Sequence, residues 1–196
     1  MPARHVLIIA AHPGLPDTES LGMSMARTYA QTPHMAGDHI RLLQLDDLDF
    51  DPMLRSGYQR PQDLEPCLRM AQDDIAWADE LVLVFPIWWG GMPALLKGFL
   101  DRMLLPGFAF RYEPKGLGLT PLLKGKTARL IITMDTPRWI DRWLCGSPVI
   151  RQLRYPILRF YGIKLREVLF FSPFILSSLS QRQDWIERVR KLAHRH

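Results

Sequence analysis

Two adjacent tryptophans followed by two glycines, Trp88, Trp89, Gly90 and Gly91, form the part of this sequence best suited to hold a flat ligand. Tryptophan pairs usually pack in a core, but in a loop they offer large aromatic faces that need a partner. Glycine lacks a Cβ, so backbone beside it can approach a ring closely and its amides can bond to the ring. Such amides can also stabilise negative charge as a ring is reduced. This segment therefore predicts a site for a planar cofactor.

A second candidate group lies near the N-terminus, where His12 precedes Thr18 and Ser20 at the start of a predicted helix. Hydroxyls and free amides at a helix N-terminus form an anion site, so phosphate is the expected guest. The same hydroxyls also serve as ordinary N-caps, and that interpretation stays open. His12 is either a donor to the ligand or a structural residue of the turn. The loop has neither the GxGxxG nor the GxxxxGK[ST] pattern, so it is neither a dinucleotide Rossmann loop nor a P-loop.

A third candidate loop contains Thr133, Met134, Asp135 and Thr136, which offer hydroxyls, amides and one carboxylate. Asp135 and Asp17 are the acidic candidates in these loops, and they lack the paired spacing that carboxylate hydrolysis requires. No Ser/His/Asp set or GxSxG elbow is found either. The residues therefore indicate binding, and they identify no acid–base group.

The segments that must position these loops alternate between strand-like and helix-like patterns. Apolar runs predict strands at residues 5–10, 40–45, 81–85, 128–133 and 168–171. Helical spacing predicts helices at residues 20–31, 63–78, from Pro93 onward, 148–161 and 180–195. This alternation implies right-handed crossovers and a doubly wound α/β sandwich with a parallel sheet. Ligands bind such sheets beyond the carboxyl ends of the strands, where all three candidate loops fall.

Length and composition limit the class of protein. The 196 residues, 47% of them hydrophobic and 23% charged, predict one domain over residues 1–196 with a full core. Cys67 and Cys145 lack CxxC spacing, so we expect neither a disulfide framework nor a metal site. The apolar start at residues 6–11 is too short to span a bilayer and no cleavage site follows it. We therefore expect a cytoplasmic protein without membrane insertion.

The net charge of +5 arises from basic residues that concentrate toward the C-terminal end. A basic surplus raises the question of nucleic-acid binding. The final segment, however, has the pattern of an amphipathic helix with a solvated basic face, and a charge run alone indicates only solubility and non-specific attraction. Nucleic acid is therefore not an expected partner.

Three segments together, FPIWWGGMPALLKGFLDRMLLPGFAF, the AAHP loop and LLKGKTARLIITMDTP, resemble the NAD(P)H:quinone oxidoreductase family of flavodoxin-like flavoproteins. The resemblance covers nearly the whole chain and implies a flavodoxin-like three-layer sandwich with a five-stranded parallel sheet. It implies a flavin, FAD or FMN, hydride transfer from NAD(P)H to flavin N5, and two-electron transfer to a quinone or similar small acceptor. It also implies a homodimer with sites at the subunit interface. The alternative is a flavin-bearing electron carrier or a regulatory accessory subunit of a transport system.

Carried over by position, the resemblance assigns residues of all three loops to the flavin. These residues are His12, Thr18, Ser20, Pro86, Ile87, Trp88, Trp89, Gly90, Thr133, Met134, Asp135 and Thr136. The acceptor pocket is assigned to Gly91, Phe108, Phe110 and Tyr112, the aromatic ones partly for the neighbouring subunit. Lys97, Asp101 and Arg102 belong to the same motif and are expected on the helix surface, with pairing at i, i+1 or i+4.

The sequence departs from the family pattern at several points. Gly90 and Gly91 stand where members often have an aromatic and a small polar residue, and the usual Thr-Thr-Gly-Gly loop is replaced by residues 133–136. Ser20-Leu21-Gly22 stands near the position of a Ser-Phe-Asn phosphate loop, so FAD and FMN both remain open. The Tyr and His that assist proton movement in some members have no match, so no catalytic acid–base residue is assigned.

Overall fold

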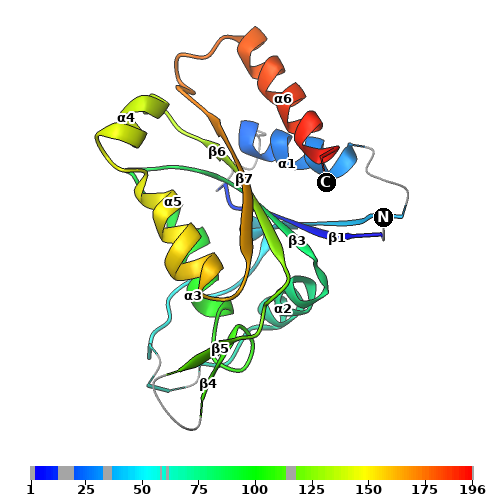
Figure 1. Ribbon diagram of the computed structural model, residues 1–196, viewed down its shortest axis with the longest axis vertical. Helices are drawn as coiled ribbons and strands as arrows, with labels where there is room; N and C mark the ends of the chain where they lie inside the picture. The colour runs from blue at the N-terminus through cyan, green and yellow to red at the C-terminus, as the bar shows by residue number, and fades with distance from the viewer. Residues whose placement is uncertain are drawn as a thin grey trace.

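A five-stranded parallel sheet forms the centre of the computed structural model, which describes residues 3–12, 20–32, 37–57, 59–60, 62–113 and 118–195 (Figure 1). In sheet order the strands are β2 (His39–Gln44), β1 (His5–Ala10), β3 (Glu80–Pro86), β6 (Thr127–Thr133) and β7 (Lys164–Phe171). All neighbouring strands are parallel. The α/β flavodoxin-like sandwich implied by the resemblance is thereby confirmed.

Helices cover both faces of the sheet because successive strand residues point to opposite sides. On β1, Leu7 and Ile9 pack into one apolar cluster, whereas Val6 and Ile8 pack into the other. The first cluster is covered by α2 (Pro66–Trp77), α3 (Ala94–Met103), α5 (Pro148–Gln152) and the π-helix η2 (Leu153–Arg159). The second is covered by α1 (Leu21–Gln31) and α6 (Leu179–Ala193). Figure 1 shows these two helices together on one side of the sheet.

The remaining elements are short, and the sequence patterns did not predict them. They are the 3-10 turn η1 (Leu45–Asp47), the hairpin strands β4 (Phe110–Tyr112) and β5 (Leu119–Pro121), and α4 (Arg138–Trp143). The expected helix over 148–161 is divided into α5 and η2. Pro156 lies inside η2, where it supplies no N–H and its ring crowds the preceding turn, so regular α-helical bonding stops. The fifth strand begins at Lys164, four residues earlier than expected.

Arg102 of α3 is completely buried, so the expectation that it lies on the helix surface is wrong. Its guanidinium donates to the backbone carbonyls of Asp51 and Asp63 at 2.5 and 2.8 Å, and it pairs with Glu65 at 2.7 Å. These contacts hold the chain between η1 and α2 against α3. The expected i, i+4 pair of Lys97 with Asp101 is present at 2.5 Å.

At Gly98 of α3, the segment between η1 and α2 lies directly against the helix. A Cβ built at this glycine would lie 2.4 Å from the Pro52 Cβ and 2.6 Å from the Pro52 carbonyl oxygen. Such distances leave no room for any side chain, because the obstructing atoms belong to the backbone and a rigid ring. Glycine is therefore required here by packing rather than by its backbone angles.

Gly98→Ala should lower the free energy of unfolding by about 1–3 kcal/mol through overpacking. The same change at an exposed mid-helix glycine stabilises a helix by about 1 kcal/mol, so the sign of the effect tests the contact. Urea unfolding of the two proteins measures it. Lys97→Ala is the matched control, since it removes only one solvated ion pair and should change stability by no more than about 0.5 kcal/mol. A stabilised Gly98→Ala protein would contradict the packing described here.

A buried ion network lies where β1, β3 and β6 begin. Glu80 and Arg129 are both almost fully buried, and the Arg129 Nε lies 3.0 Å from the Glu80 carboxylate. Arg129 also donates to the Tyr29 hydroxyl at 3.1 Å and to the Leu192 carbonyl at 2.7 Å. Burial raises the pKa of Tyr29 to about 12, so its hydroxyl is neutral and can accept this bond. The network thus joins the sheet to α1 and to the end of α6.

In the described part of the chain, no helix combines the length and the apolar character needed to cross a bilayer.

Candidate functional site

A cavity of about 480 Å³ lies beyond the carboxyl ends of β1, β3 and β6, between the loops that follow them. It brings together eight residues predicted from the sequence, namely His12, Ser20, Pro86, Ile87, Trp88, Thr133, Met134 and Asp135. Five more residues line it that the sequence analysis did not assign to the site, namely Leu21, Gly22, Ser24, Phe174 and Arg182. In open parallel sheets, ligands commonly bind beyond the carboxyl ends of the strands, at the point where the strand order reverses.

The first turn of α1 forms one wall of the cavity. The Ser20 side-chain oxygen accepts from the Met23 amide at 3.1 Å, so this serine is the N-cap. Leu21 and Gly22 follow it in a turn whose first amides have no acceptor inside the helix. A Cβ at Gly22 would lie 3.5 Å from the His12 ring, an ordinary van der Waals distance, so His12 lies beside the first turn of α1. Thr18 lies outside the residues that the structure describes.

The tryptophan–glycine segment is a tight turn. The Trp88 amide donates to the Gly91 carbonyl at 3.0 Å, and the Gly91 amide donates to the Trp88 carbonyl at 2.8 Å. Trp89 and Gly90 occupy its corners with φ of 50° and 72°. Positive φ at both corners is the geometry of a type I′ turn, which explains why glycine stands at position 90. The Gly91 amide is committed to the turn, so it cannot also bond to a cofactor ring as the sequence suggested.

The two tryptophans differ in their surroundings. Trp88 lines the cavity, and its ring lies edge-on to the His12 ring with 6.1 Å between centroids. Trp89 is fully exposed at the tip of the turn and does not line the cavity, and the same holds for Gly90 and Gly91. The Ile87 amide donates to the Thr133 carbonyl at 2.8 Å. This bond fixes the start of the tryptophan loop to the loop that follows β6.

The loop after β6 is fixed to the segment that follows β7. Met134 donates to the Phe171 carbonyl at 3.1 Å and accepts from the Phe174 amide at 3.0 Å. The Asp135 carboxylate accepts from the Ile175 amide at 2.9 Å, which explains the acidic residue in this loop. Thr136 is exposed and does not line the cavity. These bonds bring Phe174 into the site.

Among the described residues that line the cavity, Arg182 is the one arginine or lysine, and the sequence did not lead us to assign it to the site. It lies in the first turn of α6, where its Nε donates to the Ser177 hydroxyl at 2.9 Å and its guanidinium stacks 4.6 Å from the centre of the Phe174 ring. A capping box formed by Ser178 and Gln181 begins this helix. The Ser-x-x-Gln pattern is visible in the sequence and locates the first turn of α6, so it is a signal that could have pointed to this arginine.

The aromatic residues expected in the acceptor pocket lie elsewhere. Phe110 is 5% exposed and packs against Tyr112, Phe160 and Tyr161, with ring centroids 5.4–5.9 Å apart. Neither these residues nor Phe108 line the cavity. Figure 1 shows the β4–β5 hairpin at the lower end of the molecule, whereas the loops after β6 and β7 are at the upper end. A role in the acceptor pocket of this cavity would require the hairpin of a second copy.

The sheet order, the position of the cavity and its lining define the class of protein. The sheet is parallel and has helices on both faces. One wall of the cavity consists of apolar and aromatic residues, and another consists of a helix N-terminus and an arginine. This combination suits a ligand with a flat ring at one end and a phosphate at the other. The protein is thus a flavodoxin-like α/β sandwich with a candidate site for such a ligand beyond the carboxyl ends of its strands.

The chain belongs to the flavodoxin-like fold family, whose family model matches residues 4–193. A Haemophilus influenzae protein named as an NAD(P)H oxidoreductase is 35% identical over 138 residues, which cover 66% of this chain and 64% of that protein. A Listeria innocua FMN-dependent NADH:quinone oxidoreductase is 48% identical over 122 residues, which cover 60% of this chain and 54% of the relative. The matches thus span less than two thirds of these relatives' lengths.

A solved structure supports the fold. The NAD(P)H:quinone oxidoreductase from Methanothermobacter marburgensis superimposes with a TM-score of 0.78 at 20% identity, covering 99% of this chain and 98% of that one. At this identity the likeness concerns the fold alone. Together with the named relatives, it confirms the resemblance on which the sequence interpretation was based.

Proposed function

We propose that this protein is a flavin-dependent oxidoreductase that takes hydride from NAD(P)H and passes two electrons, by way of flavin N5, to a quinone or similar small acceptor. The observation that carries the proposal is the cavity beyond β1, β3 and β6, with Trp88 and Ile87 on one side and Arg182 on the other. The names of the Haemophilus and Listeria relatives support the same reaction class.

The residues of the cavity fit a flavin mononucleotide. The volume of about 480 Å³ falls within the range of about 300–1,000 Å³ that is usual for small-molecule sites. Pro86, Ile87 and Trp88 offer an apolar surface to the ring, and Arg182 with the first amides of α1 offers charge and donors to the phosphate. We propose FMN as the flavin, with FAD as the second candidate. The Listeria relative is named as FMN-dependent, which favours this order.

The protein's contribution is to bind and orient the reacting partners. A bound flavin supplies the hydride and electron chemistry. Trp88 forms one side of the cavity, and the Ile87–Thr133 bond keeps this wall at a fixed distance from the loop after β6. Arg182, held by Ser177 and Phe174, is oriented before the phosphate arrives. Such preorganisation reduces the entropy lost on binding.

The proposal includes a homodimer that acts in the cytoplasm. Phe108, Phe110 and Tyr112 lie away from the cavity of their own chain, so they can contribute to an acceptor pocket only through a second subunit. The alternative of an electron carrier or an accessory subunit uses the same flavin site. It differs in needing a protein partner for turnover.

Addition of FMN to the purified protein should give a yellow complex that loses its colour when NADPH or NADH is added without oxygen. A quinone added next should restore the colour, and steady NAD(P)H oxidation should follow without any partner protein. Absorbance in the visible flavin bands measures both steps. A protein that binds FMN but turns over only with a protein partner would favour the carrier. A colourless protein that binds neither FMN nor FAD would contradict the proposal.

A further inference from the structure

One stretch of the chain carries more than the whole positive surplus of the protein. Residues 138–166, which we call the basic segment, contain seven arginines and lysines and one aspartate, whereas the full chain has a net charge of +5. The rest of the chain is therefore close to neutral. This segment comprises α4, α5, η2 and the start of the edge strand β7.

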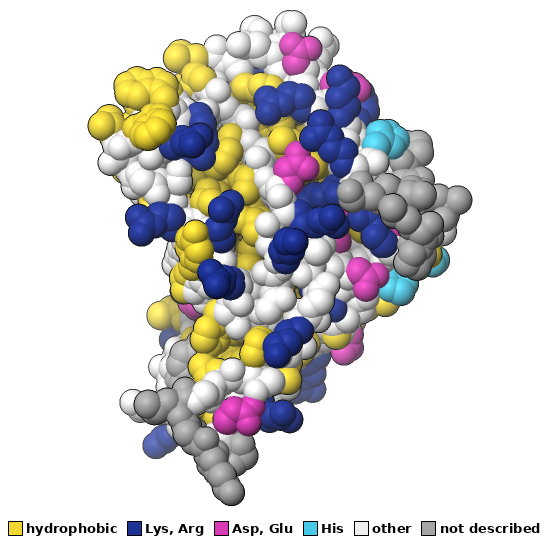
Figure 2. All heavy atoms as spheres, viewed as in Figure 1, with side chains coloured by type: hydrophobic (Ala, Val, Ile, Leu, Met, Phe, Trp, Pro, Cys, Tyr) yellow, Lys and Arg dark blue, Asp and Glu magenta, His cyan; other side chains and the backbone are white. Residues whose placement is uncertain are grey.

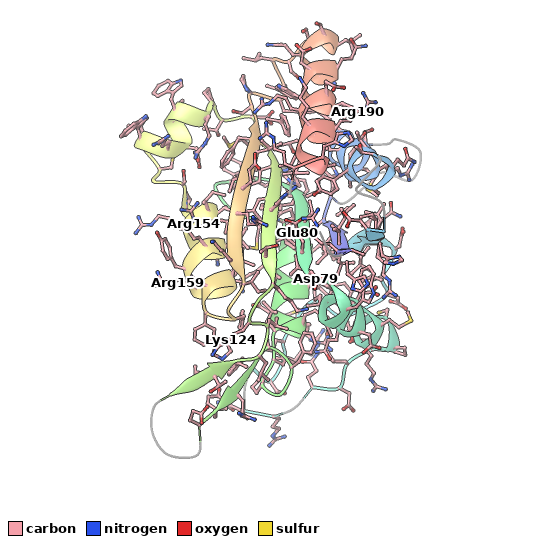
Figure 3. All side chains as sticks on the ribbon, turned by 45° about the vertical axis from the view of Figure 1, so that its right-hand side comes forward. Asp79, Glu80, Lys124, Arg154, Arg159 and Arg190 are labelled. Atoms are coloured by element: carbon pink, nitrogen blue, oxygen red, sulfur yellow. The ribbon has the colours of Figure 1, made fainter. Side chains whose placement is uncertain are left out.

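Four of these cations line an open groove of about 650 Å³ between η2 and β7. They are Arg154, Arg159, Lys164 and Arg166, and all four are exposed. None of them forms an ion pair with another residue that the structure describes. Figure 2 shows basic side chains spread over this face, and Figure 3 shows Arg154 and Arg159 extending outward from η2. No described residue pairs with them to relieve their mutual repulsion, so the groove attracts anions.

Protection of an exposed sheet edge explains only part of this arrangement. Charged residues on an edge strand discourage pairing with another chain, and Lys164 and Arg166 of β7 meet that need. Arg154 and Arg159 belong to η2, which has no free edge to protect. The groove therefore needs a second explanation.

Large apolar side chains flank the basic residues at the upper end of the same segment. Trp139, Trp143 and Leu144 of the α4 region are 61%, 74% and 74% exposed, and the Arg142 guanidinium lies 5.3 Å from the centre of the Trp143 ring. Figure 2 shows apolar atoms at the corner where Figure 1 places α4. Ile175, Leu176 and Leu179, which follow β7, are 72–79% exposed. These apolar groups are costly to leave in water without a partner.

α4 is attached firmly enough to present these side chains as a surface. The Arg138 guanidinium pairs with the buried Asp141 and stacks 3.8 Å from the centre of the Phe170 ring on β7. Asp141 also accepts from the Ser147 hydroxyl at 2.7 Å. The exposed tryptophans are therefore held outward by a braced helix.

We propose that the basic segment docks the protein on the surface of an anionic lipid bilayer. Tryptophan beside arginine is the combination favoured where headgroups meet acyl chains, and a basic groove adds attraction to anionic headgroups. A second copy of the chain meeting this face symmetrically would bring two positive surfaces together. Nucleic acid matches the charge but offers no environment for Leu144, Ile175, Leu176 and Leu179. This inference goes beyond the proposed function and does not depend on a flavin.

Binding to vesicles tests the proposal directly. The protein should sediment with vesicles that contain phosphatidylglycerol, should not sediment with phosphatidylcholine vesicles, and should be released by salt. A triple variant, Arg154→Gln, Arg159→Gln and Lys164→Gln, should bind about a hundredfold more weakly, since each cation near an anionic surface contributes about fivefold. Trp139→Ser with Trp143→Ser should abolish the quenching of tryptophan fluorescence by brominated acyl chains.

A matched control separates local charge from net charge. Arg60→Gln, Arg69→Gln and Lys191→Gln remove the same number of exposed charges outside the basic segment and should leave vesicle binding within about threefold. Equal loss in the two triple variants would overturn the proposal, as would equal binding to both kinds of vesicle. Tighter binding to a single-stranded oligonucleotide than to vesicles, or a dimer mass that only the first triple variant loses, would assign this face to a different occupant and also overturn it. Flavin content, measured in parallel, reports separately on the proposed function.

Discussion

Replacing Arg129 with methionine should lower the free energy of unfolding by about 3–5 kcal/mol, because the change leaves Glu80 buried without its main partner. Figure 3 shows Glu80 in the middle of the molecule. Arg4 reaches the same carboxylate, but only at 3.5 Å. Methionine fills a volume similar to that of the arginine stem, so the loss comes from the charge and the hydrogen bonds rather than from a cavity. Chemical denaturation with circular dichroism measures the change.

Two further variants show whether the loss comes from the stranded charge. The double variant Glu80→Leu with Arg129→Met removes both buried charges and should recover about 1–3 kcal/mol relative to Arg129→Met alone. Arg190→Met is the surface control. Its ion pair with Glu187 is solvated, so stability should change by no more than about 0.5 kcal/mol. If the double variant is as unstable as the single one, the unpaired carboxylate is not the cause.

Arg182→Gln should weaken FMN binding by about 10- to 100-fold while leaving riboflavin binding within about threefold. A hydrogen bond to a charged group contributes about 1.5–3 kcal/mol, and only FMN has the phosphate that the guanidinium is expected to meet. Quenching of flavin fluorescence on titration gives both dissociation constants. The ratio of the two constants is informative because a general disturbance of the cavity would weaken both ligands together.

Arg190→Gln provides the control on the same helix, since Arg190 is exposed and does not line the cavity. It should bind FMN as the unaltered protein does. Equal weakening of riboflavin and FMN by Arg182→Gln would mean that this residue shapes the ring pocket through Phe174 instead of holding the phosphate.

The order of strands and helices could be predicted because each buried strand is a continuous apolar run, as residues 81–85 illustrate. The short elements could not. The strands of the β4–β5 hairpin have only three residues each, too few for an alternation of apolar and polar residues to be visible. Two tryptophans of α4 are exposed, although from the sequence they could equally well have been core residues. Arg102 was misassigned because its helical spacing resembles that of a surface position, whereas its partners come from a distant loop.

The candidate site was predictable where a single loop follows a strand. His12, Trp88 and Asp135 each follow a strand that is evident in the sequence, and the sheet brings them to one cavity. Phe174 and Arg182 come from the segment after β7, which the argument from strand ends had not included. The roles of Gly90 and Gly91 also depended on backbone geometry. A turn with both corners at positive φ uses the amide that the sequence appeared to leave free for a ligand.

The buried network and the cavity arginine belong to opposite ends of one helix. Arg129 donates to the carbonyls of Leu192 and Arg195 where α6 ends, and Arg182 enters the cavity where α6 begins. The intervening helix measures about 20 Å along its axis. The contacts of Arg129 near the amino ends of the strands therefore fix the end of α6. The start of the same helix places the Arg182 guanidinium at the carboxyl ends of the strands. If Arg182 holds the phosphate of the proposed flavin, substitutions around Arg129 should change flavin affinity although they lie at the other end of α6.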